Sequence, residues 1–195
     1  MKVNSAEFVI SAPDLRSCPP ETLPEFALIG RSNVGKSSLL NLLAGQADLA
    51  RVSATPGHTR LINFFLFNRA WHLVDLPGYG YAKTAKNDPQ KFQRVVAEYL
   101  TGREILRCVL VLLDSRLPPQ QIDLEFVQWL IDERVPFALV FTKADKLKPT
   151  ALKRNTDAFY ALLNGPEDLL PKSAACSAKT RLGRSEVLSL IAGYL

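Results

Sequence analysis

The sequence predicts an α/β domain built on a mostly parallel six-stranded sheet, with one antiparallel edge strand and helices on both faces. Two continuous apolar runs, at residues 107–114 and 136–142, are typical of parallel strands that are buried on both sides. Strand-like and helix-like patterns alternate along most of the chain, which favours a parallel sheet with crossover helices. Two apolar runs separated only by Asn68 and Arg69 indicate a hairpin, and hence the antiparallel strand.

The individual elements follow from local patterns. The expected strands are residues 26–30, 61–67, 70–75, 107–114, 136–142 and 171–176. The expected helices are residues 36–44, 119–133, 150–163 and 183–195, where apolar residues recur at helical spacing. Residues 46–60 and 77–87 fit no regular element, and long irregular stretches in a compact domain tend to be functional loops. Residues 1–22 are interpreted as an N-terminal leader and residues 23–195 as one domain.

Composition limits the class of protein. With 195 residues, 47% hydrophobic and 22% charged, the chain has the size and type of a single globular domain. No apolar run approaches the length of a membrane span and the N-terminus lacks a signal-peptide core, so we expect a cytoplasmic protein without a membrane partner. Three widely separated cysteines, Cys18, Cys108 and Cys176, and only two histidines argue against a disulfide framework or a zinc site.

A glycine-rich segment after the first predicted strand carries a phosphate-binding pattern. Residues 30–37 read GRSNVGKS, which satisfies GxxxxGK[ST] between a strand and a helix. Backbone N–H groups of such a loop cradle phosphates, and the helix N-terminus adds its positive end. We expect Lys36 to reach the β- and γ-phosphates and Ser37 to ligate Mg²⁺. Alone, the pattern leaves ATP and GTP open. The expected phosphate-binding residues are Gly30, Arg31, Ser32, Asn33, Val34, Gly35, Lys36 and Ser37.

A second motif, Asp75-Leu76-Pro77-Gly78, begins where another predicted strand ends. The Asp75 carboxylate is expected near the Mg²⁺ ion, where P-loop proteins place their Walker-B aspartate. Gly78 lets the loop backbone approach the γ-phosphate closely. In isolation these four residues also read as an ordinary turn, so their assignment depends on the other motifs.

A third motif is expected to recognise the base of the nucleotide. Thr142-Lys143-Ala144-Asp145 ends the strand at 136–142 and fits the pattern [NT]KxD. In that pattern the aspartate accepts hydrogen bonds from guanine N1–H and the 2-amino group, a donor pair that adenine lacks. Asp145 is therefore expected to select GTP over ATP, while the stem of Lys143 packs over the base.

Cys176-Ser177-Ala178 follows the last predicted strand, where a backbone N–H can read guanine O6. Three small or polar residues mean little alone. The motifs nevertheless occur in the right order, each at the carboxyl end of a strand, which is where open α/β sheets bind ligands. Together they predict a guanine-nucleotide site.

Longer stretches resemble one family. GRSNVGKSSLLNLL, TPGHTRLINFF, DLPGYGYA, LLDSRLPPQQIDLE and TKADK are similar to segments of the EngB/YihA/YsxC group of bacterial GTPases, in the Era/TrmE-like branch. The resemblance runs from roughly Glu7 to the C-terminus, and its second and third stretches are specific to this group. It implies a Ras-like P-loop GTPase fold over residues 23–195, Mg²⁺-dependent GTP binding and slow hydrolysis. It also implies a role in assembling the large ribosomal subunit, with division defects when such a protein is lost.

The resemblance adds the loop Gly57-His58-Thr59 to the nucleotide-binding residues. The hydroxyl of Thr59 is expected to complete the Mg²⁺ shell when GTP is bound, with Thr55 as the competing residue. His58 is the variable position of the motif, and we interpret it as a solvated loop histidine in preference to a general base. Asn33 matches the position where related GTPases hold K⁺ beside the phosphates, or it merely suits a turn.

Catalysis is expected to be slow. Lys36, Thr59 and Gly78 are the candidate catalytic residues, because with Mg²⁺ they hold the γ-phosphate and neutralise its charge. Tyr79 follows Gly78, where many GTPases place a glutamine that orients the attacking water. A partner or a cation would have to supply that missing function.

Charge distribution favours a polyanionic partner. The chain has 24 Lys and Arg against 19 Asp and Glu, with basic surpluses in residues 79–94 and 143–184. Combined with the resemblance, this predicts that the large ribosomal subunit is the partner of a monomeric protein. The alternative is a GTP-dependent protein-interaction switch in division that does not bind the ribosome.

Overall fold

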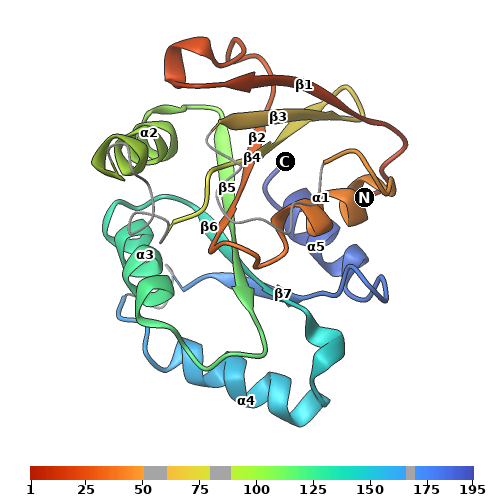
Figure 1. Ribbon diagram of the computed structural model, residues 1–195, viewed down its shortest axis with the longest axis vertical. Coiled ribbons are helices and arrows are strands. Elements are labelled where there is room, and N and C mark those ends of the chain that lie inside the picture. The colour runs from red at the N-terminus through yellow and green to blue at the C-terminus, as the bar shows by residue number, and fades with distance from the viewer. Residues whose placement is uncertain (51–60, 80–88, 166–169) are drawn as a thin grey trace.

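The computed structural model of the chain describes residues 1–50, 61–79, 89–165 and 170–195, and contains a seven-stranded sheet with helices on both faces (Figure 1). The strands are β1 (Ala6–Ala12), β2 (Glu25–Gly30), β3 (Ile62–Phe67), β4 (Trp71–Asp75), β5 (Leu106–Asp114), β6 (Phe137–Thr142) and β7 (Lys172–Ala175). Their order across the sheet is β1-β3-β4-β2-β5-β6-β7. Strand β3 is antiparallel to both of its neighbours, and every other pair is parallel. The predicted α/β class and mostly parallel sheet are confirmed.

The strand count is a correction to the prediction, whereas the expected antiparallel edge is present as the pairing of β1 with β3. The sheet has seven strands instead of six, and the antiparallel strand β3 lies inside the sheet because β1 pairs with its outer side. Strand β1 lies within the segment interpreted as a leader. A bulge between Phe8 and Ile10 breaks its alternation, and both of these side chains are exposed. A strand with neither alternation nor a buried run gives no strand signal in the sequence.

The predicted hairpin is confirmed. Residues 68–70 join β3 to β4, and the N–H of Ala70 donates to the carbonyl oxygen of Phe67 at 3.0 Å, which closes a turn around Asn68 and Arg69. These two residues have φ angles of 52° and 54°, the left-handed conformations of the central positions of a type I′ turn. The side-chain oxygen of Asn68 also accepts hydrogen bonds from the backbone N–H groups of Asn4 at 2.7 Å and Ser5 at 3.2 Å. The turn therefore guides the start of β1 onto the sheet edge.

Five α-helices lie in the described part of the chain. They are α1 (Lys36–Ala44), α2 (Pro89–Gly102), α3 (Gln121–Asp132), α4 (Pro149–Tyr160) and α5 (Arg184–Ala192). Four of them match predicted helices, whereas α2 corresponds to no predicted element. Among the described helices, none is long and apolar enough to cross a membrane.

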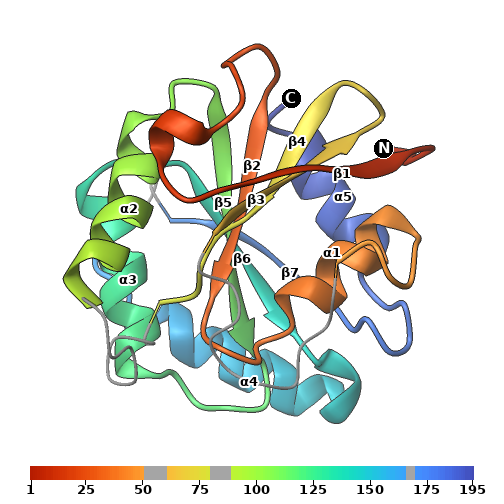
Figure 2. The same cartoon turned by 45° about the horizontal axis from the view of Figure 1, so that its top comes forward.

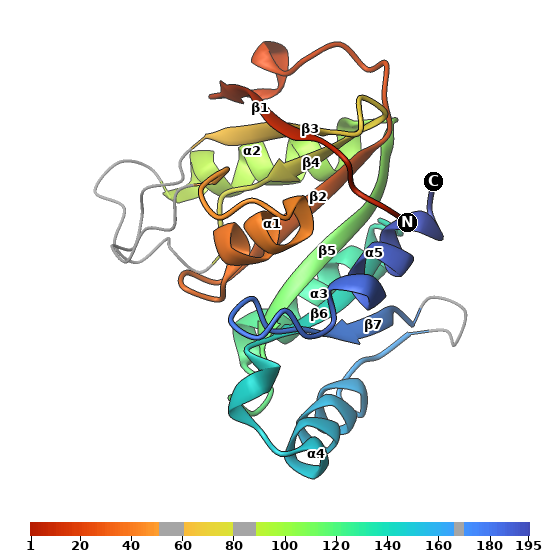
Figure 3. The ribbon, with the colours of Figure 1, turned by 90° about the vertical axis from the view of Figure 1, so that its right-hand side faces the viewer.

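Two hydrophobic cores lie on opposite faces of the sheet. One buries side chains of α1 and α5, such as Leu40 and Val187, and the other buries side chains of α2, α3 and α4, such as Tyr99 and Leu130. Figure 2 shows α1 and α5 on one side of the strands and α2 and α3 on the other. Both chain ends lie near α5 (Figure 3), where residues close to each end pack against the first core.

Helix α2 is fixed to the sheet by a buried ion pair. Glu25, at the start of β2, is fully buried and accepts hydrogen bonds from Tyr99 Oη at 2.6 Å and Arg103 Nε at 3.1 Å. Arg103 Nη2 contacts the other carboxylate oxygen of Glu25 and donates to the carbonyl oxygen of Pro19 at 3.0 Å. Because buried charges are stable only when paired, this network holds the end of α2 against the amino end of β2.

Candidate nucleotide-binding site

The predicted motifs gather at one edge of the sheet, because the parallel strands β2, β4, β5 and β6 all end there. In the strand register, Leu28 of β2 lies opposite Asp75, the last residue of β4, and Asp114 of β5 lies opposite Thr142 of β6. The segments that follow these strands are therefore neighbours in space although they are far apart in sequence. This edge is the usual ligand site of an open α/β sheet.

The phosphate loop connects β2 to α1 and has an unusual backbone. Asn33 and Gly35 have φ angles of 60° and 112°, and Gly35 is the N-cap of α1 without a side-chain hydrogen bond to the first turn within the described residues. Backbone N–H groups at the start of α1 therefore stay available to an anion. Val34, which is 4% exposed, anchors the loop in the core. Gly30 permits close packing, since a Cβ there would lie 2.7 Å from the carbonyl oxygen of Leu112.

The loop after β4 touches the phosphate loop. A Cβ added to Gly78 would collide with the carbonyl oxygen of Gly30 and would lie 3.4 Å from the amine of Lys36. The structure thus brings Lys36 and Gly78, two of the three candidate catalytic residues, to one place. The third, Thr59, lies outside the described residues together with Gly57, His58 and the competing Thr55.

Asp75 is a buried carboxylate without a protein partner among the described residues. Its side chain is 4% exposed, and Oδ1 accepts no hydrogen bond. Burial raises the pKa of Asp75 to about 6, with the charge of Lys36 acting in the opposite direction. An oxygen that is shielded from water and unpaired fits a ligand of Mg²⁺ or of its bound water. Within the described ranges, no three His, Cys, Asp or Glu side chains cluster so that they could hold a metal ion.

Leu76 and Pro77, two further residues of the predicted nucleotide-binding site, carry apolar side chains. Both are buried, and the Leu76 N–H donates to the carbonyl oxygen of Leu28 at 2.9 Å, which continues the pairing of β2 and β4 past Asp75. Tyr79 then turns toward α3, where its ring stacks on Phe126 with a centroid distance of 4.4 Å.

The first of the two base motifs, residues 142–145, is hydrogen-bonded directly to the phosphate loop, residues 30–37; the second base motif is residues 176–178. The Thr142 hydroxyl donates to the carbonyl oxygen of Val34 at 2.7 Å. The amine of Lys143 donates to the backbone carbonyl oxygen of Asn33 at 2.8 Å. Lys143 itself has a φ of 59°, a left-handed conformation that non-glycine residues rarely adopt. The adjacent Ala144 N–H donates to the carbonyl oxygen of Cys176 at 3.0 Å, which joins the two base motifs.

Asp145 is held as an ionised acceptor. Its Oδ1 accepts a hydrogen bond from the Ser177 hydroxyl at 2.7 Å, and this bond lowers the pKa of the Asp145 carboxyl. Ser177 and Cys176 are buried whereas Ala178 is exposed, so the motif presents its last residue at the surface beside Asp145. A charged carboxylate next to an exposed loop backbone has the chemistry that the guanine edge requires.

One contact at this edge is absent from the predicted site. Asp114, the last residue of β5, accepts a hydrogen bond from the Lys143 amine at 2.8 Å. Asp114 also pairs with Arg116, whose Nη2 lies 2.7 Å from Asp114 Oδ2, and neither residue is part of the predicted site. A signal did exist, because Asp114 ends a buried parallel strand just as Asp75 does.

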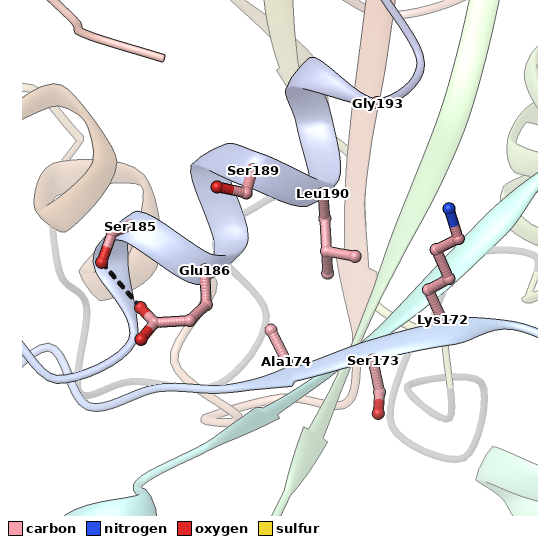
Figure 4. A pocket seen from close by; sticks show the side chains of 8 residues that line it. All are labelled: Lys172, Ser173, Ala174, Ser185, Glu186, Ser189, Leu190 and Gly193. Carbon is pink, nitrogen blue, oxygen red and sulfur yellow. Dashed lines mark hydrogen bonds between the residues drawn. The ribbon is translucent and has the colours of Figure 1, made fainter.

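A separate cavity of about 510 Å³ lies between β7 and α5 (Figure 4). Lys172 and Ala174 of the strand and Leu190 of the helix line it, and a hydrogen bond of 2.8 Å joins Ser185 and Glu186 at one end. None of the predicted nucleotide-binding residues lines this cavity.

Comparison with known proteins gives concordant matches. The family model described as "50S ribosome-binding GTPase" matches residues 25–143. A probable GTP-binding protein EngB from Bacteroides fragilis (strain YCH46) is 51% identical over 191 residues, covering 98% of this chain and 95% of that protein. A protein of the same name from Christiangramia forsetii is 50% identical over 193 residues, covering 99% and 98%. The crystal structure of a probable GTP-binding protein engB has the same fold, with a TM-score of 0.70, 22% identity and coverage of 87% and 97%.

Proposed function

Because this chain belongs to the EngB family of GTP-binding proteins, we propose that it is a GTP-controlled switch in the assembly of the large ribosomal subunit. The chain is a GTPase. In the proposal, the GTP form binds the ribosomal particle and hydrolysis to GDP releases it. The protein acts as a cytoplasmic monomer, and normal cell division and septation depend on the cycle.

A group of exposed basic side chains beside the base motif supports this partner. Lys148 is the N-cap of α4, shortly after the base motif, and Lys179 and Arg181 lie in the loop between β7 and α5. The matching family is described as ribosome-binding. An exposed basic surface attracts polyanions, and the phosphates of ribosomal RNA are such a ligand. The side chains of a second basic group fall outside the described residues: Lys83, Lys86 and Lys91.

Phosphate binding in this proposal uses backbone and lysine donors. The N–H groups at the start of α1 and the amine of Lys36 surround the β- and γ-phosphates, and the backbone of Gly78 approaches the γ-phosphate. Tyr79 does not replace the water-orienting glutamine, because its ring is stacked on Phe126. Intrinsic hydrolysis is therefore slow, and the partner or a cation accelerates it.

Mg²⁺ fits the orphaned carboxylate of Asp75. Ser37 and Asp75 would hold the ion, and Thr59 would join them in the GTP state. When bound, Mg²⁺ neutralises charge on the β- and γ-phosphate oxygens. Asn33 is the candidate K⁺ ligand, since its side chain is exposed and the Lys143 amine fixes its backbone carbonyl.

Guanine recognition is assigned to Asp145, which reads N1–H and the 2-amino group, and to the backbone at Ala178, which reads O6. The stem of Lys143 covers the base. The bond between Ser177 and Asp145 supports this assignment because it orients the carboxylate before the base arrives.

Co-sedimentation with purified large subunits tests the partner. Protein loaded with a non-hydrolysable GTP analogue should pellet with large subunits at low salt, and GDP-loaded protein should not. Replacing Lys148, Lys179 and Arg181 with glutamine should reduce the salt slope of log K by up to about three, roughly one per lost phosphate contact.

A matched control removes the same charge at the opposite end of the parallel strands. Arg69, Arg107 and Arg134 are exposed there, and replacing them with glutamine should leave the salt slope unchanged. The ribosomal proposal fails if the GTP-loaded protein does not sediment with large subunits at low salt, or sediments equally well with GDP. The alternative, a switch in division that does not bind ribosomes, would then be favoured.

A further inference from the structure

The carboxylate of Asp114 is held between two cations. Arg116 contacts it at two points, with Nε 2.9 Å from Oδ1 and Nη2 2.7 Å from Oδ2. The amine of Lys143 donates to Oδ2 at 2.8 Å. Burial alone would raise the pKa of Asp114, but the hydrogen bonds from Arg116 and Lys143 prevail and lower it to about 2. With 11% of its side chain exposed, Asp114 holds this geometry where water competes weakly.

Lys143 is fixed at both its backbone and its amine. Its φ of 59° is a strained conformation for a non-glycine residue, which persists only where the surroundings impose it. The amine bridges Asp114 Oδ2 and the carbonyl oxygen of Asn33, with both distances 2.8 Å. A lysine stem that is anchored at both ends has few remaining rotamers, although 29% of the side chain is exposed.

We propose that Asp114, which is itself held by Arg116, is a positioning residue for guanine binding. Asp114 fixes Lys143 so that the lysine stem covers the base while the lysine amine stays bonded to the phosphate loop. The benefit is preorganisation, because a lysine already confined loses little freedom when the nucleotide binds. The proposal rests on the assignment of the guanine site to Asp145, and the test below separates the two.

Dissociation of a fluorescent guanine nucleotide, mant-GDP, measures the effect. Asp114→Asn keeps the size of the side chain and removes its charge, so the dissociation rate should rise about five- to tenfold, and KM for GTP should rise by a similar factor. Asp114→Glu retains the charge and should lie closer to wild type. Arg116→Gln changes a side chain that is 46% exposed, and it should give about a two- to threefold increase without disturbing the fold.

A matched control and a double-mutant cycle make the test specific. Asp157→Asn removes a carboxylate that pairs with Lys153 at 2.6 Å on the exposed face of α4, and it should leave dissociation unchanged. Lys143→Met keeps the stem and removes the amine. In that background Asp114→Asn should have no further effect, because the group it holds is gone.

Three results would overturn the proposal. One is a wild-type dissociation rate in both Asp114→Asn and Arg116→Gln. Another is an effect of Asp114→Asn that multiplies with that of Lys143→Met, since Asp114 would then act independently of the amine. The third is an equal effect of the Asp157→Asn control. Failure of the guanine site itself is recognised separately, because Asp145→Asn would then leave the preference for GDP over XDP intact.

Discussion

Replacing Asp145 with asparagine is a direct test of the proposed guanine site. The carboxylate is 12% exposed, and the Ser177 hydroxyl orients it through a bond of 2.7 Å and lowers its pKa, so it is ionised at neutral pH. Each charge-assisted hydrogen bond to the base contributes a factor of about ten to one hundred in affinity. Losing two such bonds should weaken guanine-nucleotide binding by about two to four orders of magnitude.

The amide of Asp145→Asn can still accept from Ser177, so the loop should keep its shape while its hydrogen-bonding pattern changes. Xanthine offers a carbonyl oxygen where guanine has its 2-amino group, and the asparagine NH₂ can donate to it. Titrations with mant-GDP and mant-XDP should therefore show reversed preference, whereas the Asp157→Asn control should behave as wild type. A variant that still prefers GDP to XDP would refute the assignment of this loop to guanine.

Three further predictions concern the cation, the buried carboxylate and the fold. Hydrolysis should be faster in KCl than in NaCl at equal ionic strength, and Asn33→Ala should abolish the difference; equal wild-type rates in both salts would contradict this. Without nucleotide and Mg²⁺, the raised pKa of Asp75, about 6 against its usual 3.8, means that the folded protein binds more protons between these values. Stability then falls as pH rises through this range, so in urea titrations Asp75→Asn should raise the unfolding free energy by up to about 3 kcal/mol at pH 8 and by almost nothing near pH 4. Arg103→Ala leaves Glu25 as an unpaired buried charge and should cost about 3–5 kcal/mol, against at most about 1 kcal/mol for Lys153→Ala in an exposed pair, measured the same way.

Apolar patterns in the sequence predict strands that are buried on both faces and helices that bury one regular stripe of side chains. Strands β5 and β6 are continuous apolar runs, and the hairpin is predicted because only Asn68 and Arg69 separate two apolar runs. Strand β1 escapes prediction for a physical reason: it pairs on one side only, and its bulge exposes Phe8, Val9 and Ile10. Helix α2 is also missing from the predicted elements, but for another reason: the sequence does carry its signal, because its apolar residues recur at helical spacing.

Site residues divide in a similar way. The glycine loop and the Thr142–Asp145 motif are predictable because their function depends on residues adjacent in sequence. The contact between Asp114 and Lys143 is not, since it joins residues 29 positions apart through the pairing of β5 with β6. The bond from Lys143 to Asn33 spans 110 positions and requires β2 to lie next to β5. Such contacts are consequences of strand order, which local patterns do not specify.

The same contacts indicate which part of the site responds to the γ-phosphate. Thr142 and Lys143 bond to the carbonyl oxygens of Val34 and Asn33, so the base motif holds the phosphate loop in its unusual backbone conformation. In the proposed site GDP contacts both of these regions, so we expect the additional γ-phosphate of GTP to leave the bonds on the base side unchanged. We therefore expect the difference between GTP and GDP mainly at Gly78, which packs so closely on the phosphate loop that a Cβ there would collide with the carbonyl oxygen of Gly30 and lie 3.4 Å from the Lys36 amine. A partner that distinguishes the two nucleotides should therefore contact the surface at Gly78 and Tyr79. Basic residues near the base should add affinity that does not depend on the nucleotide state.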